Sequence, residues 1–339
     1  NQGLFGGVAG VTKPIPAGSL RHVDQNVETA YSHFYSLSLQ REIAGSTVAT
    51  VEYTGSTGRS LYDLADPNKR GAKLVYTGVG SPSDRPLNQY GAFNTRGNRG
   101  KSQYHGVTFG LESRRLGNSG LQFTVRYTLA QAKDNLSSTF SDSFNNFNLG
   151  YLDAFDPDLD YGYADFDVRH RVVFAGLWEL PIFRNSEGAT RTLLGGWQIN
   201  WIFTARTGFA FSTFDCTNAQ FAVCMRAEDP VGINKDATDG PGTGSPNEFT
   251  LLDLTPIMGS AGAYVNPITG NSEFGPWPAS MTERGAFRGP GSWNVDMSLS
   301  KRFRFGDRYA LQVRVEAYNL FNHANMIAYT TNADVSSFD

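Results

Sequence analysis

The sequence predicts an all-β fold, about eight to ten strands that form part of an antiparallel transmembrane β-barrel with long loops. Three observations predict it. Apolar and polar residues alternate over long stretches, these stretches come in pairs, and short and long connections alternate along the chain. The composition agrees, because 13% aromatic residues, 18% charged residues and 37 Gly in 339 residues suit β-structure with many turns.

The alternation is clearest over residues 121–129, where Leu, Phe, Val, Tyr and Leu alternate with Gln, Thr, Arg and Thr. A period of two gives each strand one apolar and one polar face. The pattern is weaker around Val172 to Phe174, which is apolar on both faces. The predicted strand pairs cover about 34–43 with 49–54, 107–112 with 121–129, 171–180 with 197–206, and 293–300 with 309–316.

The connections give the predicted sheet a direction. They are short within each pair, whereas long loops cover about 55–101, 134–167 and 207–292. In an up-and-down meander all three long loops then emerge on one side, as outer-membrane barrels place their extracellular loops. Strands of about 10 to 13 residues, at ~3.3 Å per residue, are long enough to cross a tilted hydrocarbon layer. We therefore expect one barrel domain over residues 1–339.

A membrane barrel turns its apolar face to lipid and its polar face to a wet lumen. Lumenal charges are expected to pair with one another across the barrel wall, with contact to a plug or substrate as the alternative; these are Glu112, Arg126, Arg314 and Glu316. Aromatic residues near strand ends predict interfacial girdles, or simple packing, at Tyr53, Trp178, Trp197, Trp201 and Trp293. The alternative fold is a soluble β-sandwich, whose apolar faces pack inward.

Charge and motifs exclude several function classes. A net charge of −3 lacks the basic surface that nucleic-acid binding requires. No apolar run is long enough for a transmembrane helix, and residues 1–30 lack signal-peptide features, so an export signal is expected upstream. Hydrolase, zincin, Walker and dinucleotide motifs are missing from the sequence, so we expect no enzyme, catalytic residue or cofactor. His170, between two arginines, is expected to make a structural hydrogen bond.

The loops contain candidate residues for a disulfide and for a calcium site. Cys216 and Cys224 are the only cysteines and are expected to form a disulfide in an exposed loop. Asp156, Asp158 and Asp160 are weak calcium candidates, because alternate carboxylates can gather around Ca²⁺ but the spacing lacks the Gly and Glu of an EF-hand. Asp165 and Asp167 are expected to fix the loop-to-strand junction beside Arg169 and Arg171.

Five short strings are spread over nearly the whole chain: Tyr35-Ser36-Leu37-Ser38-Leu39-Gln40-Arg41, Asp165-Phe166-Asp167-Val168-Arg169-His170-Arg171, Leu194-Gly195-Gly196-Trp197-Gln198-Ile199, Arg288-Gly289-Pro290-Gly291 and Glu316-Ala317-Tyr318-Asn319-Leu320-Phe321-Asn322-His323. In this order they resemble the C-terminal barrel of Oar-like TonB-dependent transporters. The resemblance implies a barrel of about 22 strands in the bacterial outer membrane, plugged by an N-terminal domain. It also implies ligand uptake driven by the inner-membrane TonB complex.

The chain departs from that family pattern at both ends. Nothing in it resembles a TonB box, a plug domain or the carboxypeptidase-regulatory-like module. We therefore expect it to be the C-terminal part of a barrel, with the plug and the terminal strand outside it, and unable to close a barrel of that size alone. The expected partners are outer-membrane lipid, the TonB complex and an unknown ligand. The alternatives are a structural or adhesive surface barrel that displays loops, and a secreted carbohydrate-binding β-sandwich.

The cysteine pair gives the first testable prediction. Protein isolated from the oxidising cell envelope should show no free thiol on labelling and electrophoresis, because Cys216 and Cys224 are joined. After reduction, both thiols should react. Two free thiols before reduction would contradict the disulfide.

Overall fold

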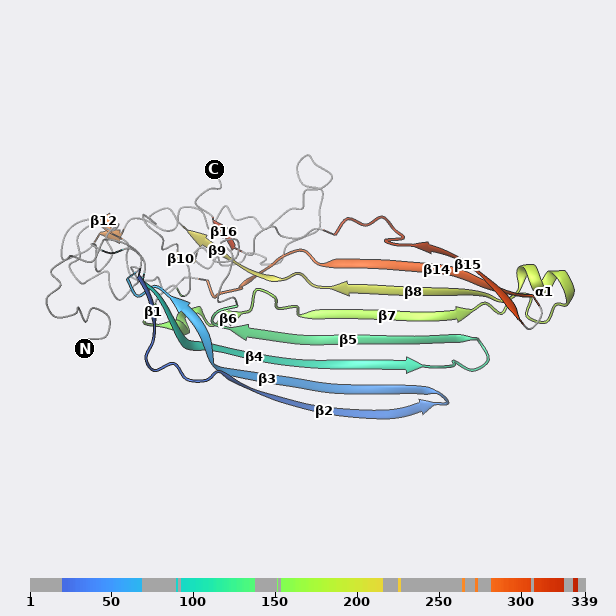
Figure 1. Ribbon diagram of the computed structural model, residues 1–339, viewed down its shortest axis with the longest axis horizontal. Helices are drawn as coiled ribbons and strands as arrows, with labels where there is room; N and C mark the ends of the chain where they lie inside the picture. The colour runs from blue at the N-terminus through green and yellow to red at the C-terminus, as the bar shows by residue number, and fades with distance from the viewer. Residues whose placement is uncertain are drawn as a thin grey trace.

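The computed structural model describes residues 20–68, 90, 93–137, 151, 154–215, 225–226, 264–265, 272–273, 282–305, 308–325 and 332–334. Its main feature is a ten-stranded sheet whose long strands run side by side (Figure 1). The long strands are β2 (Tyr31–Ala44), β3 (Thr47–Ala65), β4 (Phe93–Ser113), β5 (Leu121–Asp134), β7 (His170–Glu179), β8 (Trp197–Arg206), β14 (Ser292–Phe305) and β15 (Tyr309–Ala317).

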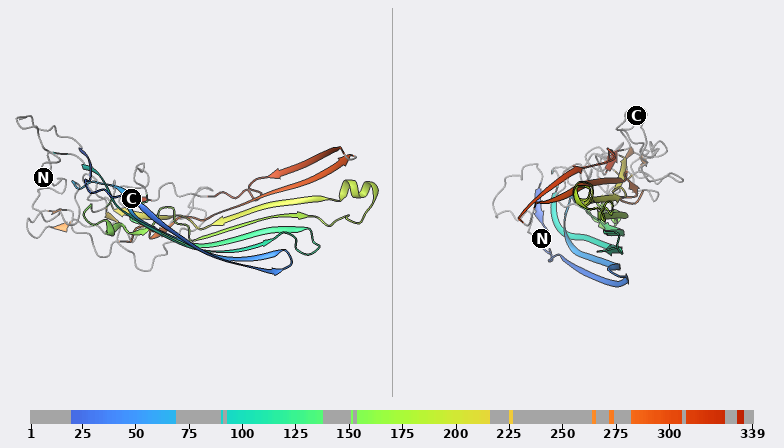
Figure 2. Two further views of the ribbon diagram at one scale, coloured as in Figure 1. Left: turned by 60° about the horizontal axis from the view of Figure 1, so that its bottom comes forward. Right: turned by 90° about the vertical axis from the view of Figure 1, so that its right-hand side faces the viewer.

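These eight strands form an antiparallel meander in the order β15-β14-β8-β7-β5-β4-β3-β2, which confirms the predicted pairs and their order. Viewed along the strands, the sheet bends into an open trough with β2 and β15 at its two edges (Figure 2). Among the described residues these two edge strands do not pair with each other. The all-β fold is therefore confirmed, as an open sheet consistent with part of a larger barrel.

The register places apolar residues together on one face. Leu37 lies opposite Tyr53, Val51 opposite Phe109, and Phe109 opposite Tyr127. These side chains have no apolar layer over them, since Leu37 and Leu39 are 64% and 67% exposed. An exposed apolar face with paired backbone is what a bilayer requires of a sheet.

Shorter elements lie mostly at one end of the sheet. There β1 (Leu20–Val23) pairs with β4, and β6 (Gly162–Tyr163) pairs with β5. The others there are β9 (Ala210–Asp215), β10 (Met225–Arg226), β11 (Tyr264–Val265), β12 (Ser272–Glu273), β13 (Phe287–Arg288), β16 (Asn332–Asp334) and the 3-10 helix η1 (Pro157–Asp160). Among the described residues, no helix is long and apolar enough to cross a membrane.

The predicted boundaries of the first long loop are wrong. β3 continues to Ala65 and β4 begins at Phe93, so both strands extend well into the predicted loop 55–101. Their pairing continues through register shifts between Gly58 and Asp63. Backbone hydrogen bonds hold this extension, but its side chains do not sort into one apolar and one polar face. The alternation criterion therefore detects only the part of each strand that has an apolar face.

The opposite end carries the short connections and one helix that the sequence did not predict. α1 (Gly188–Leu194) lies in the connection between β7 and β8 (Figure 1). Its C-terminal end is tied to the sheet, because the Lys301 ammonium donates to the Gly195 carbonyl. The Lys301 ammonium also lies 5.5 Å from the centre of the Trp197 ring. A cation thus joins α1 to the ends of β8 and β14.

Aromatic rings cover glycines on neighbouring strands. A Cβ at Gly55 would lie 2.2 Å from the Tyr35 ring, and one at Gly176 would lie 2.2 Å from the Trp201 ring. Trp201 also meets Phe174 edge-on at 5.4 Å. Trp201 lies in the middle of β8, so it packs against the sheet, the alternative to a girdle position. Tyr53 stacks on His105 and bonds it at 2.7 Å, near the long-loop end.

The two faces of β2 give a prediction with a matched control. Leu37→Arg places a charge on the apolar face and should lower the free energy of unfolding in lipid vesicles by about 2–4 kcal/mol if it lies near the bilayer midplane. Ser38→Arg, its neighbour on the polar face, should change it little. Denaturant titration of the intact protein, followed by tryptophan fluorescence, measures both. Equal effects of the two substitutions would contradict this assignment of faces.

Candidate functional site

The buried apolar side chains that the structure describes lie at the long-loop end, away from α1. Among the described residues, the buried apolar side chains are Ala65, Tyr151, Ala164, Ala210, Phe211 and Phe287. All of them lie in the long connections or where a strand meets one. We call this region the loop cap, made of the described residues within 60–68, 93–101, 132–137, 151–169, 207–215 and 282–291. The described parts of the loops therefore pack together at the end of the sheet.

An ion pair with a buried carboxylate joins β3 and β4 to the second long loop. Asp63 on β3 is 1% exposed, and the Nε of Arg99 on β4 lies 3.0 Å from its carboxylate. The same guanidinium donates to the Ala154 carbonyl at 2.5 Å and lies over the Tyr151 ring. Burial raises the pKa of Tyr151, and the Asp63 carboxylate raises it further, so the phenol stays neutral. Arg99 thus fixes this loop against β3 and β4.

Arg284 joins the third long loop to the second. Its guanidinium contacts Asp134 at 2.5 Å, Ser137 at 2.6 Å and Asp165 at 3.4 Å. Burial lowers the pKa of Arg284, but the Asp134 and Asp165 carboxylates outweigh it, so the net shift is upward. Burial raises the pKa of Asp165, with Asp134 adding to the rise and Arg284 opposing it. One cation therefore holds two carboxylates that would otherwise repel each other.

The loop-to-strand junction is fixed by Asp165 and Asp167, as expected, but their predicted neighbours are wrong. Asp167 pairs with Arg288 at 2.5 Å, and its carboxylate accepts the Ala132 N–H at 2.5 Å. Arg288 and Arg284 come from the third long loop, whereas Arg169 donates to the Tyr163 hydroxyl at 2.9 Å. No local pattern signals partners about 120 residues away in sequence.

His170 behaves as predicted. Its Nδ1 lies 2.8 Å from the Tyr127 hydroxyl, and the two rings stack with their centres 6.1 Å apart. The bond joins β5 and β7 on the apolar face at the long-loop end. His170 is therefore a structural residue.

The calcium candidates do not form a metal-binding group. Asp158 pairs with Lys101 at 2.6 Å, and Asp156 precedes η1 while Asp160 ends it. In the part of the chain that the structure describes, no three His, Cys, Asp or Glu side chains gather as a metal site requires. Cys216 and Cys224 lie outside the described residues.

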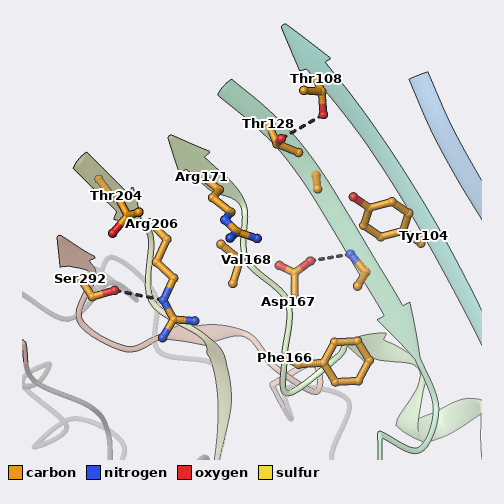
Figure 3. A pocket seen from close by; sticks show the side chains of 13 residues that line it. Tyr104, Thr108, Thr128, Phe166, Asp167, Val168, Arg171, Thr204, Arg206 and Ser292 are labelled. Carbon is orange, nitrogen blue, oxygen red and sulfur yellow. Dashed lines mark hydrogen bonds between the residues drawn. The ribbon is translucent and has the colours of Figure 1, made fainter. Parts of the chain in front are cut away.

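A cavity of about 660 Å³ opens on the polar face of the sheet, directly beneath the loop cap (Figure 3). Its wall combines two arginines, Arg171 and Arg206, with the ring of Tyr104 and with the buried Asp167. Hydroxyl groups complete the polar lining, from Thr108, Thr128, Thr204 and Ser292. Concave sites with a few convergent polar groups are the usual form of ligand pockets.

Among the described residues, the lumenal charges do not pair across the barrel wall as predicted. Arg314 pairs with Glu316 at 3.0 Å on β15. Glu112 pairs instead with Arg114 at 3.5 Å, beyond the end of β4. Arg126 is exposed and has no carboxylate partner among the described residues. The arginines of the polar face therefore divide into paired and unpaired ones.

The sequence was compared with family models, solved structures and curated proteins. The family model described as outer membrane beta barrel domain matches residues 3–338. Among solved structures, the outer membrane transporter YddB from Escherichia coli matches with a TM-score of 0.46 and 11% identity, over 92% of this chain and 31% of that chain. A search of curated proteins finds no significant match.

The chain thus spans 31% of the length of that transporter. The match to the family model covers nearly the whole sequence, and its description agrees with the exposed apolar face of the sheet. This places the protein in the bacterial outer membrane, with its apolar face toward lipid and its polar face toward the lumen. The chain belongs to the outer membrane beta barrel domain family.

Proposed function

We propose that the protein is a TonB-dependent outer-membrane receptor that imports a ligand through its barrel, and that it acts by binding and transport without catalysis. The observation that carries the proposal is the loop cap above the polar cavity. Ion pairs of Arg284 and Arg288 join the described part of the third long connection to that of the second and to the end of β5. Arg99, which pairs with Asp63, joins β3 and β4 to the second connection. The cavity lies on the polar face of the sheet beside these contacts. A rigid scaffold that presents shaped loops is a common design for ligand capture.

The position of the cavity favours import over display. A barrel that only displays loops needs an outer surface, but it has no use for a polar pocket inside the lumen. The cavity lies on the polar face of the sheet, along which a ligand released from the loops would pass. The five short strings that resemble Oar-like transporters support TonB as the energy source.

An adhesive surface barrel is the second candidate, favoured by the size of the cap and by the aromatic side chains that it leaves exposed. Phe155 and Phe166 are 55% and 60% exposed in the cap. Exposed aromatic side chains are frequent in binding surfaces. Adhesion and import differ in one respect that is easily measured, because adhesion requires no energy from the inner membrane.

A genetic test separates the two functions. Cells that lack the gene should fail to take up at least one compound from a panel of radiolabelled nutrients, and cells that lack TonB should show the same defect. The double mutant should be no worse than either single mutant, because both act in one process. Restoring the gene should restore uptake only where TonB is present. An uptake defect that is additive with loss of TonB, or no defect at all, would count against import.

The ion pairs of the cap give a prediction about its rigidity. Arg284→Met leaves Asp134 and Asp165 buried beside each other without a counter-charge, which should cost about 3–5 kcal/mol of local stability. The intact variant, in detergent, should be cleaved much faster in its loops during limited proteolysis. Arg302→Met removes an exposed arginine of β14 and serves as the control. Equal cleavage rates in both variants would show that Arg284 does not hold the cap.

A further inference from the structure

Three arginines lie in a row across the lumenal wall. Arg171 on β7 is directly opposite Arg206 on β8 in the register. On the next strand, Thr128 of β5 is opposite Arg171, so Arg126 lies diagonally from it on the same face. Like charges directly opposite each other across two strands are destabilising, because their Cβ atoms are only about 5 Å apart. Such an arrangement calls for a compensating negative charge.

The described part of the chain does not supply that charge. Its ion pairs engage Arg99, Arg114, Arg284, Arg288, Arg314 and Lys101, and none involves the three arginines of the row. Arg206 donates only to the Ser292 hydroxyl, at 3.0 Å, and lies over the Phe209 ring at 4.2 Å. Arg171 is exposed toward the cavity (Figure 3).

Asp167 is the one acidic residue in the cavity wall, and it is already engaged. Its carboxylate is held by Arg288 and by the Ala132 N–H, and the residue is 1% exposed. Counting Arg171, Arg206 and Arg288 against Asp167 leaves a local excess of positive charge. The cavity is therefore cationic, although the whole chain has a net charge of −3.

We propose that Arg171 and Arg206 bind an anionic group of the imported ligand, a carboxylate or a phosphate. This inference rests on the proposed import function and adds the chemical class of the ligand. The planar guanidinium matches both groups through paired hydrogen bonds. Thr128, Thr204 and Ser292 line the same cavity and supply hydroxyl donors to the remaining oxygens. Arg126 lies next along the row, toward the periplasmic end, and provides a second binding position for the anion.

Calorimetry with small anions tests the site. The intact protein in detergent at low ionic strength is titrated with inorganic phosphate and, separately, with acetate. The double variant Arg171→Gln/Arg206→Gln should bind the preferred anion at least about tenfold more weakly, because each substitution removes charge-assisted hydrogen bonds. Arg314→Gln makes the same charge change on the lumenal face at a paired arginine and should bind like the wild type.

A conservative variant guards against misfolding. Arg171→Lys/Arg206→Lys keeps the charge but loses the forked geometry, so its affinity should lie between those of the wild type and the Gln variant. Heat-modifiable migration on gels shows that each variant is folded. Tighter binding of phosphate or of acetate identifies the group that the site prefers. The proposal is overturned if the wild type binds neither anion, as when a carboxylate of the protein itself occupies the arginines, or if the folded Gln variant binds as well as the wild type.

The outcome is distinguishable from that of the import proposal. If anion binding depends on Arg171 and Arg206 but uptake does not depend on TonB, the anion site stands and TonB-dependent import fails. If uptake depends on TonB while the Gln variant binds anions normally, import stands and the anion site fails.

Discussion

The structure depends on one constraint, that a sheet in hydrocarbon must pair its backbone polar groups without help from water. Long strands in continuous register satisfy it, and so the sheet is a single layer with its apolar side chains left exposed. The same constraint acts on the edges of the trough. β2 and β15 do not pair with each other among the described residues, and in a bilayer the unpaired backbone groups of such edges need a partner.

Because the sheet needs no second layer, the packed core of the protein lies outside the membrane. Phe211 and Phe287 meet at 5.6 Å between β9 and β13, within the loop cap. Around such apolar contacts, arginines from one long connection neutralise carboxylates of another. Buried ion pairs add little net stability, but breaking one is costly, so they specify one arrangement of the loops. The cap is thus held in shape by charge as well as by apolar packing.

The sequence predicted what local periodicity encodes. The eight strands, their order and their two faces follow from alternation, because one face of each strand lies against lipid, which is uniformly apolar. The prediction failed where a strand no longer has an apolar face toward lipid. β3 extends beyond Gly55 and β4 begins before Ser102, and these extensions pair with each other without an apolar face. The partners of Asp165 and Asp167 come from a segment about 120 residues away. Contacts of that kind depend on the folded topology, which no local pattern records.

The same separation explains why the candidate site could not be found from the sequence. The sequence places Arg171 at the start of one predicted strand and Arg206 at the end of the next, and no local pattern indicates that the two meet. The register of β7 and β8 places them opposite each other. Within the cap, each arginine that approaches a carboxylate is neutralised by it, and Asp167 is taken by Arg288. Arg171 and Arg206 have no carboxylate partner among the described residues because the nearby Asp167 pairs with Arg288, so the ion pairs of the cap leave the cavity beneath it with an excess of positive charge.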